Sequence, residues 1–396
     1  MSNNWNVVPF TEAVDICDTF RKPINSSERA SRIKGKEQSE LYPYYGATGQ
    51  VGFIDDYITD GEYVLLGEDG APFLDAFSNK AYIISGKTWV NNHAHVLRSK
   101  TNNKFLCYYL NSFNYKGYVS GTTRLKLTQA EMKRIPVPVP PLPEQERIVA
   151  RIEELFSQLD AGVETLKKTK AQLAVYRQAV LKEAFNSAEV DCKMLSIAEI
   201  LTKTRKGMST GPFGTMIKKS DHKATGVPML GIENIGRGQF VDGNKIYVTA
   251  EKAEELKAFS LKAGDIIISR SGTVGEICAV PERAEGSLLS TNLMRVSLDN
   301  TMVRSDYFIA LFQSKGIVLD QIKELCKGST RDFLNQTILK QIVFPVPSME
   351  KQEEIVSIIE ARMSVCDSIE QTVDTALQQA ETMRQSILKD AFEGRL

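Results

Sequence analysis

Two arginines follow short Gly-Thr/Ser-Thr runs at matching places in the two halves of this 396-residue chain. Arg124 comes directly after Thr123, and Arg331 comes directly after Thr330. Arginine donates to phosphates and to guanine, and threonine hydroxyls bind phosphates, so each pair could contact the backbone or a base edge of DNA. The alternative is a structural arginine that ties a domain to the helix that follows it.

A second group of candidate DNA-contacting residues lies in polar turns next to apolar runs. Arg270 lies in the sequence SRSGTVG, directly after an apolar run, and exposed loops often carry binding residues. Asparagine can pair with adenine, although turn chemistry explains an Asn-Asn pair equally well. Lys218 and Lys219 are candidates either for phosphate contacts or for an ordinary solvated face. The other candidates of this group are Ser269, Ser271, Thr273, Lys87, Asn91 and Asn92.

The chain carries no catalytic motif that we recognise. A GxxxxGK[ST] phosphate loop, an Asn/Asp-Pro-Pro-Tyr/Phe methyltransferase run and a strand-borne GxGxxG are all missing. Of the three histidines, His93 and His95 alternate and would share one face of a strand, but no third metal ligand is evident. We therefore expect no catalytic residue and no metal site, and ordinary strand residues at both histidines.

Two long helices are the first elements predicted to position these residues. Five of the 14 prolines lie between Pro136 and Pro143, and proline suits the first turn of a helix but not its interior. Apolar residues then recur every seven positions, which is typical of helices that pair side by side. We predict helices over residues 143–186 and 346–396. The main row is Ile152, Leu159, Leu166, Leu173 and Val180, then Ile359, Cys366, Val373, Ala380 and Ile387. The second row is Ile148, Leu155 and Tyr176, then Ile355, Ile369, Ala376 and Met383.

The two helical segments are copies of one another at an offset of 207 residues. Gln145 and Glu146 correspond to Gln352 and Glu353 at the two helix entries. These four residues are interpreted either as helix caps or as a docking point for a partner. Matching length and register predict that the helices pair within one chain; a surface helix or an oligomerising zipper is the alternative.

The segments before the helices have a different pattern. Short runs such as GEYVLL, KAYIIS, GDIIIS and LMRVSL are bounded by turn residues and predict strands, while NKFLCYYLNSF and SDYFIALFQSKG predict helices. The expected fold is α+β, with two similar mixed domains over 1–142 and 187–345, each followed by a long helix.

The composition is that of an ordinary globular protein, with 42% hydrophobic residues, 25% charged residues and a net charge of +0. No apolar run has the roughly 18 residues that a membrane span needs, and no secretory signal is visible. The six scattered cysteines fit reduced thiols. We therefore expect a cytoplasmic protein.

This layout resembles the specificity subunit of type I restriction-modification systems. The resemblance is carried by IPVPVPPLPEQERIVARIEELF from Ile135, by VFPVPSMEKQEEIV from Val343, and by the phrases TTRLKL, STRDFL, LSTNLMRV and IIISRSGTVG. It covers essentially the whole chain. The first half departs from the family's common phrasing, because GEYVLLGEDGAP replaces a turn of the Ser-Arg-Ser-Gly type.

The resemblance implies a non-catalytic subunit with two target recognition domains that read the halves of a split sequence in double-stranded DNA. It implies that the helices form an antiparallel coiled coil that sets the spacing. It also implies two methyltransferase subunits, which use S-adenosylmethionine to methylate adenine N6, and restriction subunits, which use ATP and Mg²⁺; this chain itself would bind no cofactor. A coiled-coil scaffold that never touches DNA is the alternative, and a methyltransferase with unrecognised motifs is a third reading.

Overall fold

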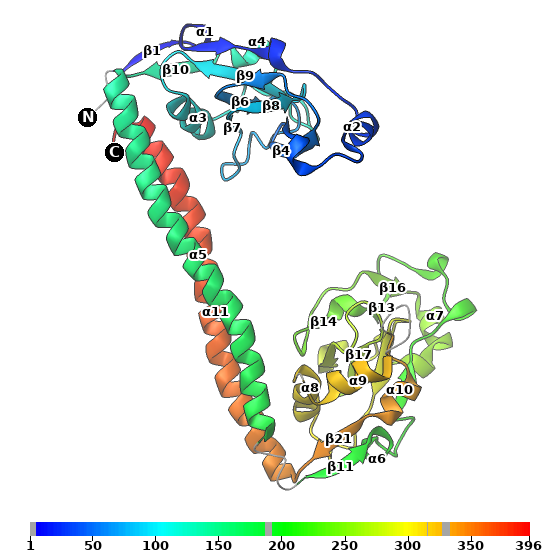
Figure 1. Cartoon of the computed structure of the whole chain (residues 1–396). Coiled ribbons are helices and arrows are strands. Elements are labelled where there is room, and N and C mark those ends of the chain that lie inside the picture. The colour runs from blue at the N-terminus through cyan, green and yellow to red at the C-terminus, as the bar shows by residue number, and fades with distance from the viewer. Residues whose placement is uncertain (1–4, 187–191, 315, 327–332) are drawn as a thin grey trace. The chain divides into compact units, whose positions relative to one another are not determined.

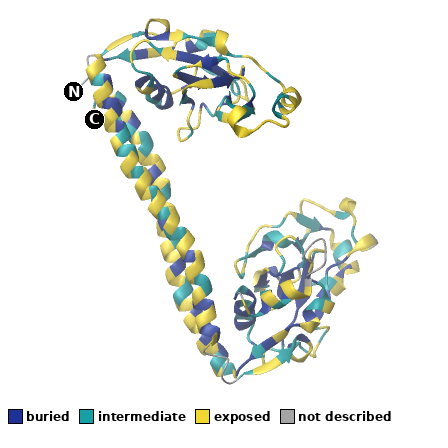
Figure 2. Cartoon of the chain, in the orientation of Figure 1, coloured by how far each residue is buried: buried dark blue, intermediate teal, exposed yellow. Residues whose placement is uncertain are grey.

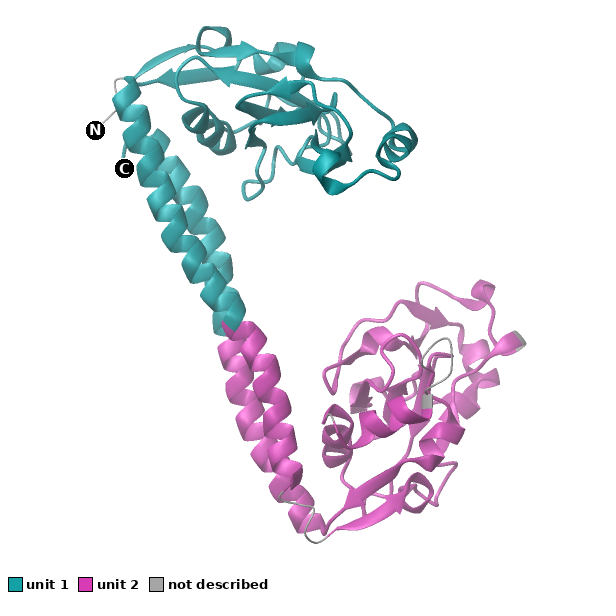
Figure 3. Ribbon diagram, in the orientation of Figure 1, with its two compact units in different colours: residues 1–168, 372–396 teal, residues 169–371 magenta. Residues whose placement is uncertain are grey.

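The computed structural model describes residues 5–186, 192–314, 316–326 and 333–396 (Figure 1). The chain divides into two compact units (Figure 3). Unit 1 is residues 1–168 with 372–396, and unit 2 is residues 169–371. Each unit contains one mixed domain and a segment of each long helix. Each long helix is therefore divided between the two units.

The domain of unit 1 is built on two four-stranded sheets, in the orders β2-β9-β6-β7 and β4-β3-β8-β5, and on the ribbon β1-β10. The strands are β1 (Asn6–Pro9), β2 (Val14–Ile16), β3 (Tyr42–Gly46), β4 (Gly49–Ile54), β5 (Thr59–Asp60), β6 (Tyr63–Gly67), β7 (Ala81–Ile84), β8 (Lys87–Val90), β9 (Ala94–Ser99) and β10 (Pro136–Val139). The short helices are α1 (Phe10–Ala13), α2 (Ser26–Ile33), α3 (Asn103–Ser112) and α4 (Gln129–Met132). The predicted strands GEYVLL and KAYIIS and the predicted helix NKFLCYYLNSF are confirmed as β6, β7 and α3.

The domain of unit 2 has the sheets β12-β20-β17-β18 and β16-β13-β19 and the ribbons β14-β15 and β11-β21. The strands are β11 (Lys193–Ser196), β12 (Met208–Thr210), β13 (Val227–Leu230), β14 (Ile235–Gly236), β15 (Gln239–Phe240), β16 (Ile246–Val248), β17 (Ile266–Ser269), β18 (Ile277–Ala279), β19 (Leu288–Leu289), β20 (Leu293–Val296) and β21 (Val343–Val346). The short helices are α6 (Ile197–Ile200), α7 (Ala250–Glu255), α8 (Ser305–Gln313), α9 (Val318–Cys326) and α10 (Gln336–Gln341).

The two long helices are α5 (Leu142–Asn186) and α11 (Met349–Phe392), close to the predicted bounds. In unit 1, Asp160 of α5 pairs with Arg384 of α11. In unit 2, Arg177 of α5 lies 2.7 Å from Asp367 of α11. Early residues of one helix therefore meet late residues of the other, so the helices run antiparallel. The two ion pairs are also copies of each other, because both partners are related by the offset of 207.

The predicted heptad rows are only partly confirmed by burial along the helices (Figure 2). Ile152, Val180 and Cys366 of the main row are buried. In the second row, Tyr176 and Met383 are 49% and 54% exposed. Two helices alone present a narrow interface, which the main row fills, and arginine–carboxylate pairs occupy its flank.

An aromatic residue near the end of each long helix packs into a domain. Phe185 of α5 lies edge-on to Tyr307 of α8, with ring centroids 5.6 Å apart. Its copy, Phe392 of α11, lies edge-on to Phe105 and Tyr109 of α3, at 5.2 and 5.4 Å. The first domain therefore packs against the end of α11, and the second domain packs against the end of α5. This packing explains why each unit contains segments of the long helices.

Candidate nucleic-acid interface

A polar turn follows strand β6 where three segments of unit 1 meet. The amide of Glu68 donates to the carbonyl of His93 (2.8 Å), and the amide of Leu127 donates to the carbonyl of Glu68 (2.7 Å). The amide of Gly70 donates to the carbonyl of Leu125 (2.9 Å). These bonds hold the end of β6, the loop before β9 and the segment before α4 together.

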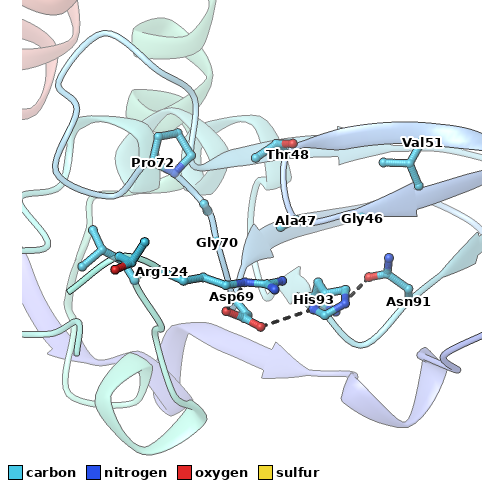
Figure 4. Close-up of a pocket in the computed structure, with 13 residues that line it drawn as sticks. Gly46, Ala47, Thr48, Val51, Asp69, Gly70, Pro72, Asn91, His93 and Arg124 are labelled. Atoms are coloured by element: carbon cyan, nitrogen blue, oxygen red, sulfur yellow. Dashed lines mark hydrogen bonds and ion pairs between the residues drawn. The ribbon is translucent and has the colours of Figure 1, made fainter. Parts of the chain in front are cut away.

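These three segments, together with the turn between β3 and β4, line an open pocket of about 710 Å³ (Figure 4). Nε of Arg124 lies 2.7 Å from Oδ1 of Asp69, and Nδ1 of His93 lies 3.6 Å from Oδ2 of the same carboxylate. The Arg124 side chain is 60% exposed, so its guanidinium can reach a ligand. Gly70 has a φ of +79°, and a Cβ there would lie 3.1 Å from Nε of Arg124. The turn therefore favours glycine for its backbone, and a Cβ at this position would crowd the arginine that crosses it.

The pocket brings together three of the predicted residues: Thr123, Arg124 and Asn91. Thr123 and Arg124 are exposed, as a DNA contact requires. Asn91 is buried, and its side-chain oxygen accepts from the amide of His93 (2.8 Å). The turn interpretation therefore holds for Asn91, and the structure does not support it as a direct base contact.

Two other predicted residues of unit 1 do not line this pocket. Asn92 is exposed in the loop after β8. Lys87 is exposed at the opposite end of the same strand, where its ammonium lies 4.6 Å from the ring centroid of Tyr57. A contact of Lys87 with DNA would therefore belong to a different part of the surface.

The sequence did not identify Asp69 as a site residue, and it raised His93 only as a metal ligand. Among the residues that the structure describes, no group of three or more His, Cys, Asp or Glu side chains could hold a metal ion. The signal for Asp69 was the Gly-Glu-Asp-Gly turn itself, because glycines on both sides leave the carboxylate side chain projecting from a tight turn.

Unit 2 repeats the turn with different side chains. The amide of Arg270 donates to the carbonyl of Asn292 (2.9 Å), and the amide of Leu334 donates to the carbonyl of Arg270 (3.0 Å). The backbone of Glu68 in unit 1 makes the same pair of hydrogen bonds, one with the loop before a strand and one with the residue equivalent to Leu334. Arg270 is therefore the structural equivalent of Glu68. Its guanidinium lies 4.6 Å from the ring centroid of Phe333, and Nη1 donates to the carbonyl of Thr291 (3.1 Å). Burial lowers the pKa of Arg270.

The neighbours of Arg270 differ in their exposure. Ser269 is fully buried and donates to the carbonyl of Ser271 (3.1 Å), so its predicted role in DNA binding is not supported. Ser271 is half-buried and Thr273 is exposed. Thr330 and Arg331, the predicted copies of Thr123 and Arg124, lie outside the described residues. Lys218 and Lys219 are exposed at a short turn before β13, and their role stays a prediction.

The matched glutamines at the helix entries are structural. Gln145 is buried, donates to the carbonyl of Pro140 (2.8 Å) and accepts from Thr101 (2.9 Å). Gln352 is buried and donates to the carbonyls of Met302 and Pro347 (2.8 and 3.0 Å).

Both glutamine side chains therefore tie the helix start to the domain, which contradicts a docking role for the glutamines themselves. The adjacent Glu146 and Glu353 are exposed, so docking remains a prediction for them.

The family model for the type I restriction modification DNA specificity domain matches residues 4–174 and, a second time, residues 193–379. The chain belongs to this family. It is a DNA specificity subunit with one recognition domain in each unit. No described helix is long and apolar enough to cross a membrane.

Relatives and solved structures agree with this assignment. The specificity subunit is 29% identical over 380 residues to S.HindORF215P of Haemophilus influenzae, provisionally named a type I restriction enzyme specificity subunit, covering 94% of this chain and 91% of that protein. It is 25% identical over 391 residues to the EcoBI specificity subunit of Escherichia coli, covering 92% and 79%. A chain from a solved type I restriction-modification system has the same fold, with a TM-score of 0.72, 16% identity and full coverage of both chains. The HsdS subunit of Thermoanaerobacter tengcongensis aligns with a TM-score of 0.52 and 14% identity, covering 100% of this chain and 98% of that chain.

In the specificity subunit, Arg124 is the exposed cation of the pocket, and its replacement gives a direct test of the site. We expect Arg124→Ala to weaken binding of target DNA by the assembled complex by about 1–3 kcal/mol, roughly 5- to 150-fold. Fluorescence anisotropy at several salt concentrations would measure this loss. Arg134→Ala is the matched control, because Arg134 is equally exposed in the same domain and pairs locally with Glu131.

The salt series also separates the two ways in which Arg124 could act. Loss of a phosphate contact weakens all DNA equally and lowers the slope of log K against log salt by about 0.9. Loss of a base contact instead relaxes selectivity at one position of the target. Wild-type affinity in a folded, assembled Arg124→Ala complex would exclude both.

Proposed function

We propose that each recognition domain reads one half of a bipartite sequence in double-stranded DNA. The observation that carries this proposal is that the family's DNA specificity domain occurs twice in one chain, over 4–174 and 193–379. The equivalent turns after β6 and β17 carry different side chains: Asp69 follows Glu68, whose carboxylate pairs with Arg21, in one turn, and Ser271 follows Arg270 in the other. Because carboxylates accept from cytosine or adenine amino groups while arginine donates to guanine, the two domains would select different half-sites.

The joined arrangement follows from the energetics of reading DNA. One well-placed side chain discriminates between bases by about 1–3 kcal/mol, so a single small module gives limited selectivity. Two linked modules add their discrimination, provided that the linker keeps them at the separation of the half-sites. Helices α5 and α11, which both units share, are the elements that can supply that link.

We further propose that this chain supplies specificity and no catalysis within a larger complex. Two methyltransferase subunits, one for each copy of the repeat, would bind S-adenosylmethionine and methylate adenine N6. Restriction subunits would use ATP and Mg²⁺. The near-symmetry of the chain supports two equivalent partners, since the helix entries with Glu146 and Glu353 and the ion pairs of the helices occur twice. Such a complex would act on DNA in the cytoplasm.

The test is to express the chain with a type I methyltransferase subunit in a host without such systems, and to map adenine methylation across the genome. A new motif with two short fixed ends and unspecified bases between them is the expected result. The methyltransferase subunit expressed alone is the control. A soluble, assembled complex without new methylation would contradict the proposal and favour a scaffold that does not read DNA.

A further inference from the structure

The hairpin between β14 and β15 has an unusual backbone at its turn, Gly236-Arg237-Gly238. Arg237 has a φ of +43°, and it is the one non-glycine residue with positive φ in the described part of the chain. Glycine adopts this region freely, whereas a residue with a side chain is disfavoured there. An arginine at a position that favours glycine indicates that its side chain has a specific function.

The Arg237 side chain reaches the long helix α11. Nη1 lies 2.8 Å from Oε2 of Glu370, and Nη2 lies 3.3 Å from Oε1, which is a two-pronged pairing. Glu370 is only 17% exposed, and its Oε2 also accepts from Arg177 of α5 at 3.0 Å. The carboxylate of α11 is therefore bound by both the hairpin and α5. The neighbouring guanidinium groups hold its pKa below the ordinary value.

The backbone of the same turn is tied to α8. The side chain of Gln313 donates to the carbonyl of Arg237 (2.7 Å), and Gln178 of α5 donates to the carbonyl of Gln313 (3.2 Å). A Cβ on Gly238 would lie 2.0 Å from Nε2 of the Gln313 side chain, so the turn packs closely on α8. We call Arg237, Glu370, Gln313 and Gln178 the hairpin latch.

The latch contacts α11 beyond the core contacts between this domain and that helix. Ile355 and Ile359 of α11 belong to the core of the domain, and Met363 packs against it. Glu370 is seven residues beyond Met363, which is about 10 Å along the helix. Two attachments at this separation resist rotation of the domain about either one. The latch is also particular to unit 2, because the copy of Glu370 at the offset of 207 is Val163.

We propose that the hairpin latch fixes the orientation of the second recognition domain on the helix pair, and so makes the complex selective for the spacer between the half-sites. This inference rests on the proposed reading of a bipartite target. One base pair of spacer changes the half-site separation by about 3.4 Å. A domain attached only at its base could tilt by that much at its DNA-reading end, and a domain held at two points could not.

The decisive variant is Arg237→Gly. It removes the guanidinium but gives the turn the residue that its backbone favours, so the thermal stability of the protein should not fall. Glu370→Gln removes the charge from the other side of the latch. Arg283→Ala is the matched control, because Arg283 makes a similar two-pronged pair with Asp242 in the same domain without touching the long helices.

The readout is the methylation rate of the assembled complex on targets with the natural spacer and with spacers one base pair shorter or longer. We expect Arg237→Gly and Glu370→Gln to lower the preference for the natural spacer by about fivefold or more, with little change in the rate on the natural target. Arg283→Ala should keep the wild-type preference, and Arg237→Lys should keep part of it.

The two hypotheses fail in different ways. Wild-type spacer preference in both latch variants would overturn the latch while leaving bipartite recognition intact. A wild-type complex that methylates without regard to the spacer would overturn bipartite recognition itself. Loss of thermal stability in Arg237→Gly, without any change in spacer preference, would assign the arginine a purely structural role.

Discussion

Phe185→Ala is expected to lower the free energy of unfolding of unit 2 by about 3–5 kcal/mol. Phe185 is buried at the end of α5, where its ring packs against Tyr307 and within a core that includes Phe308 and Ile355. Alanine removes the ring and leaves a cavity that the long helix cannot close, because its other contacts fix its position. The cost is therefore the lost burial together with the cavity.

Phe392→Ala is the matched variant, since Phe392 is the copy of Phe185 in α11. Its ring contacts Phe105 and Tyr109 but is only partly buried, so we expect a smaller loss of about 2–3 kcal/mol in unit 1. Chemical denaturation, monitored by the proteolysis of each unit, would assign each loss in the free energy of unfolding to its unit. Equal stability of Phe185→Ala and the wild type would show that the domain does not depend on this contact.

The long helices were the most predictable part of the fold. A seven-residue apolar period and clustered prolines are local signals, and they placed α5 and α11 within a few residues of their ends. The repeat explains, although the sequence did not predict it, why the ion pairs of Arg177 with Asp367 and of Arg384 with Asp160 are copies of each other. The exposure of Tyr176 was not predictable, because a heptad pattern does not show how many helices pack around its apolar rows.

The candidate site was less predictable because it is assembled from distant segments. Arg124 could be proposed from its Gly-Thr-Thr context, but its partner Asp69 is 55 positions away in sequence (124 − 69), and only the strand pairing brings them together. Asn91, Ser269 and Gln145 have the polar side chains of binding residues, and the structure uses them to satisfy buried backbone groups. Residue type alone does not distinguish these two uses.

Asp18→Asn is expected to destabilise unit 1 about as much as Phe185→Ala destabilises unit 2. The Asp18 carboxylate is mostly buried and accepts from Nδ1 of His95 (2.8 Å), the amide of Val96 (2.9 Å), the side chain of Gln129 (3.1 Å) and Nη2 of Arg21 (3.1 Å). An asparagine has one acceptor fewer and carries no charge, so Arg21 loses one of its two carboxylate partners and His95 loses the carboxylate that its Nδ1 contacts. We expect a loss of about 3 kcal/mol in the free energy of unfolding at pH 7.

The pH dependence of that loss identifies its cause. Burial alone would raise the pKa of Asp18, but hydrogen bonds from His95 and Val96 and the charge of Arg21 hold it below the ordinary value. A lowered pKa in the folded state means that the stabilisation is complete above the unfolded value of about 3.9 and is lost as the pH falls through the folded value. The difference between the denaturation midpoints of wild type and Asp18→Asn should therefore be present above the unfolded pKa of about 3.9 and should shrink as the pH falls through the lower folded pKa.

Glu131→Gln serves as the control, because Glu131 makes only a local, exposed pair with Arg134 and its loss should change stability by less than about 0.5 kcal/mol. A difference for Asp18→Asn that did not shrink at any acid pH where the protein is still folded would assign the effect to packing and not to charge. The same network reaches the candidate site, since Arg21 also pairs with Glu68 at the start of the turn that carries Asp69. Below its unfolding temperature, Asp18→Asn should therefore weaken the reading of one half-site and leave the half-site read by unit 2 unchanged.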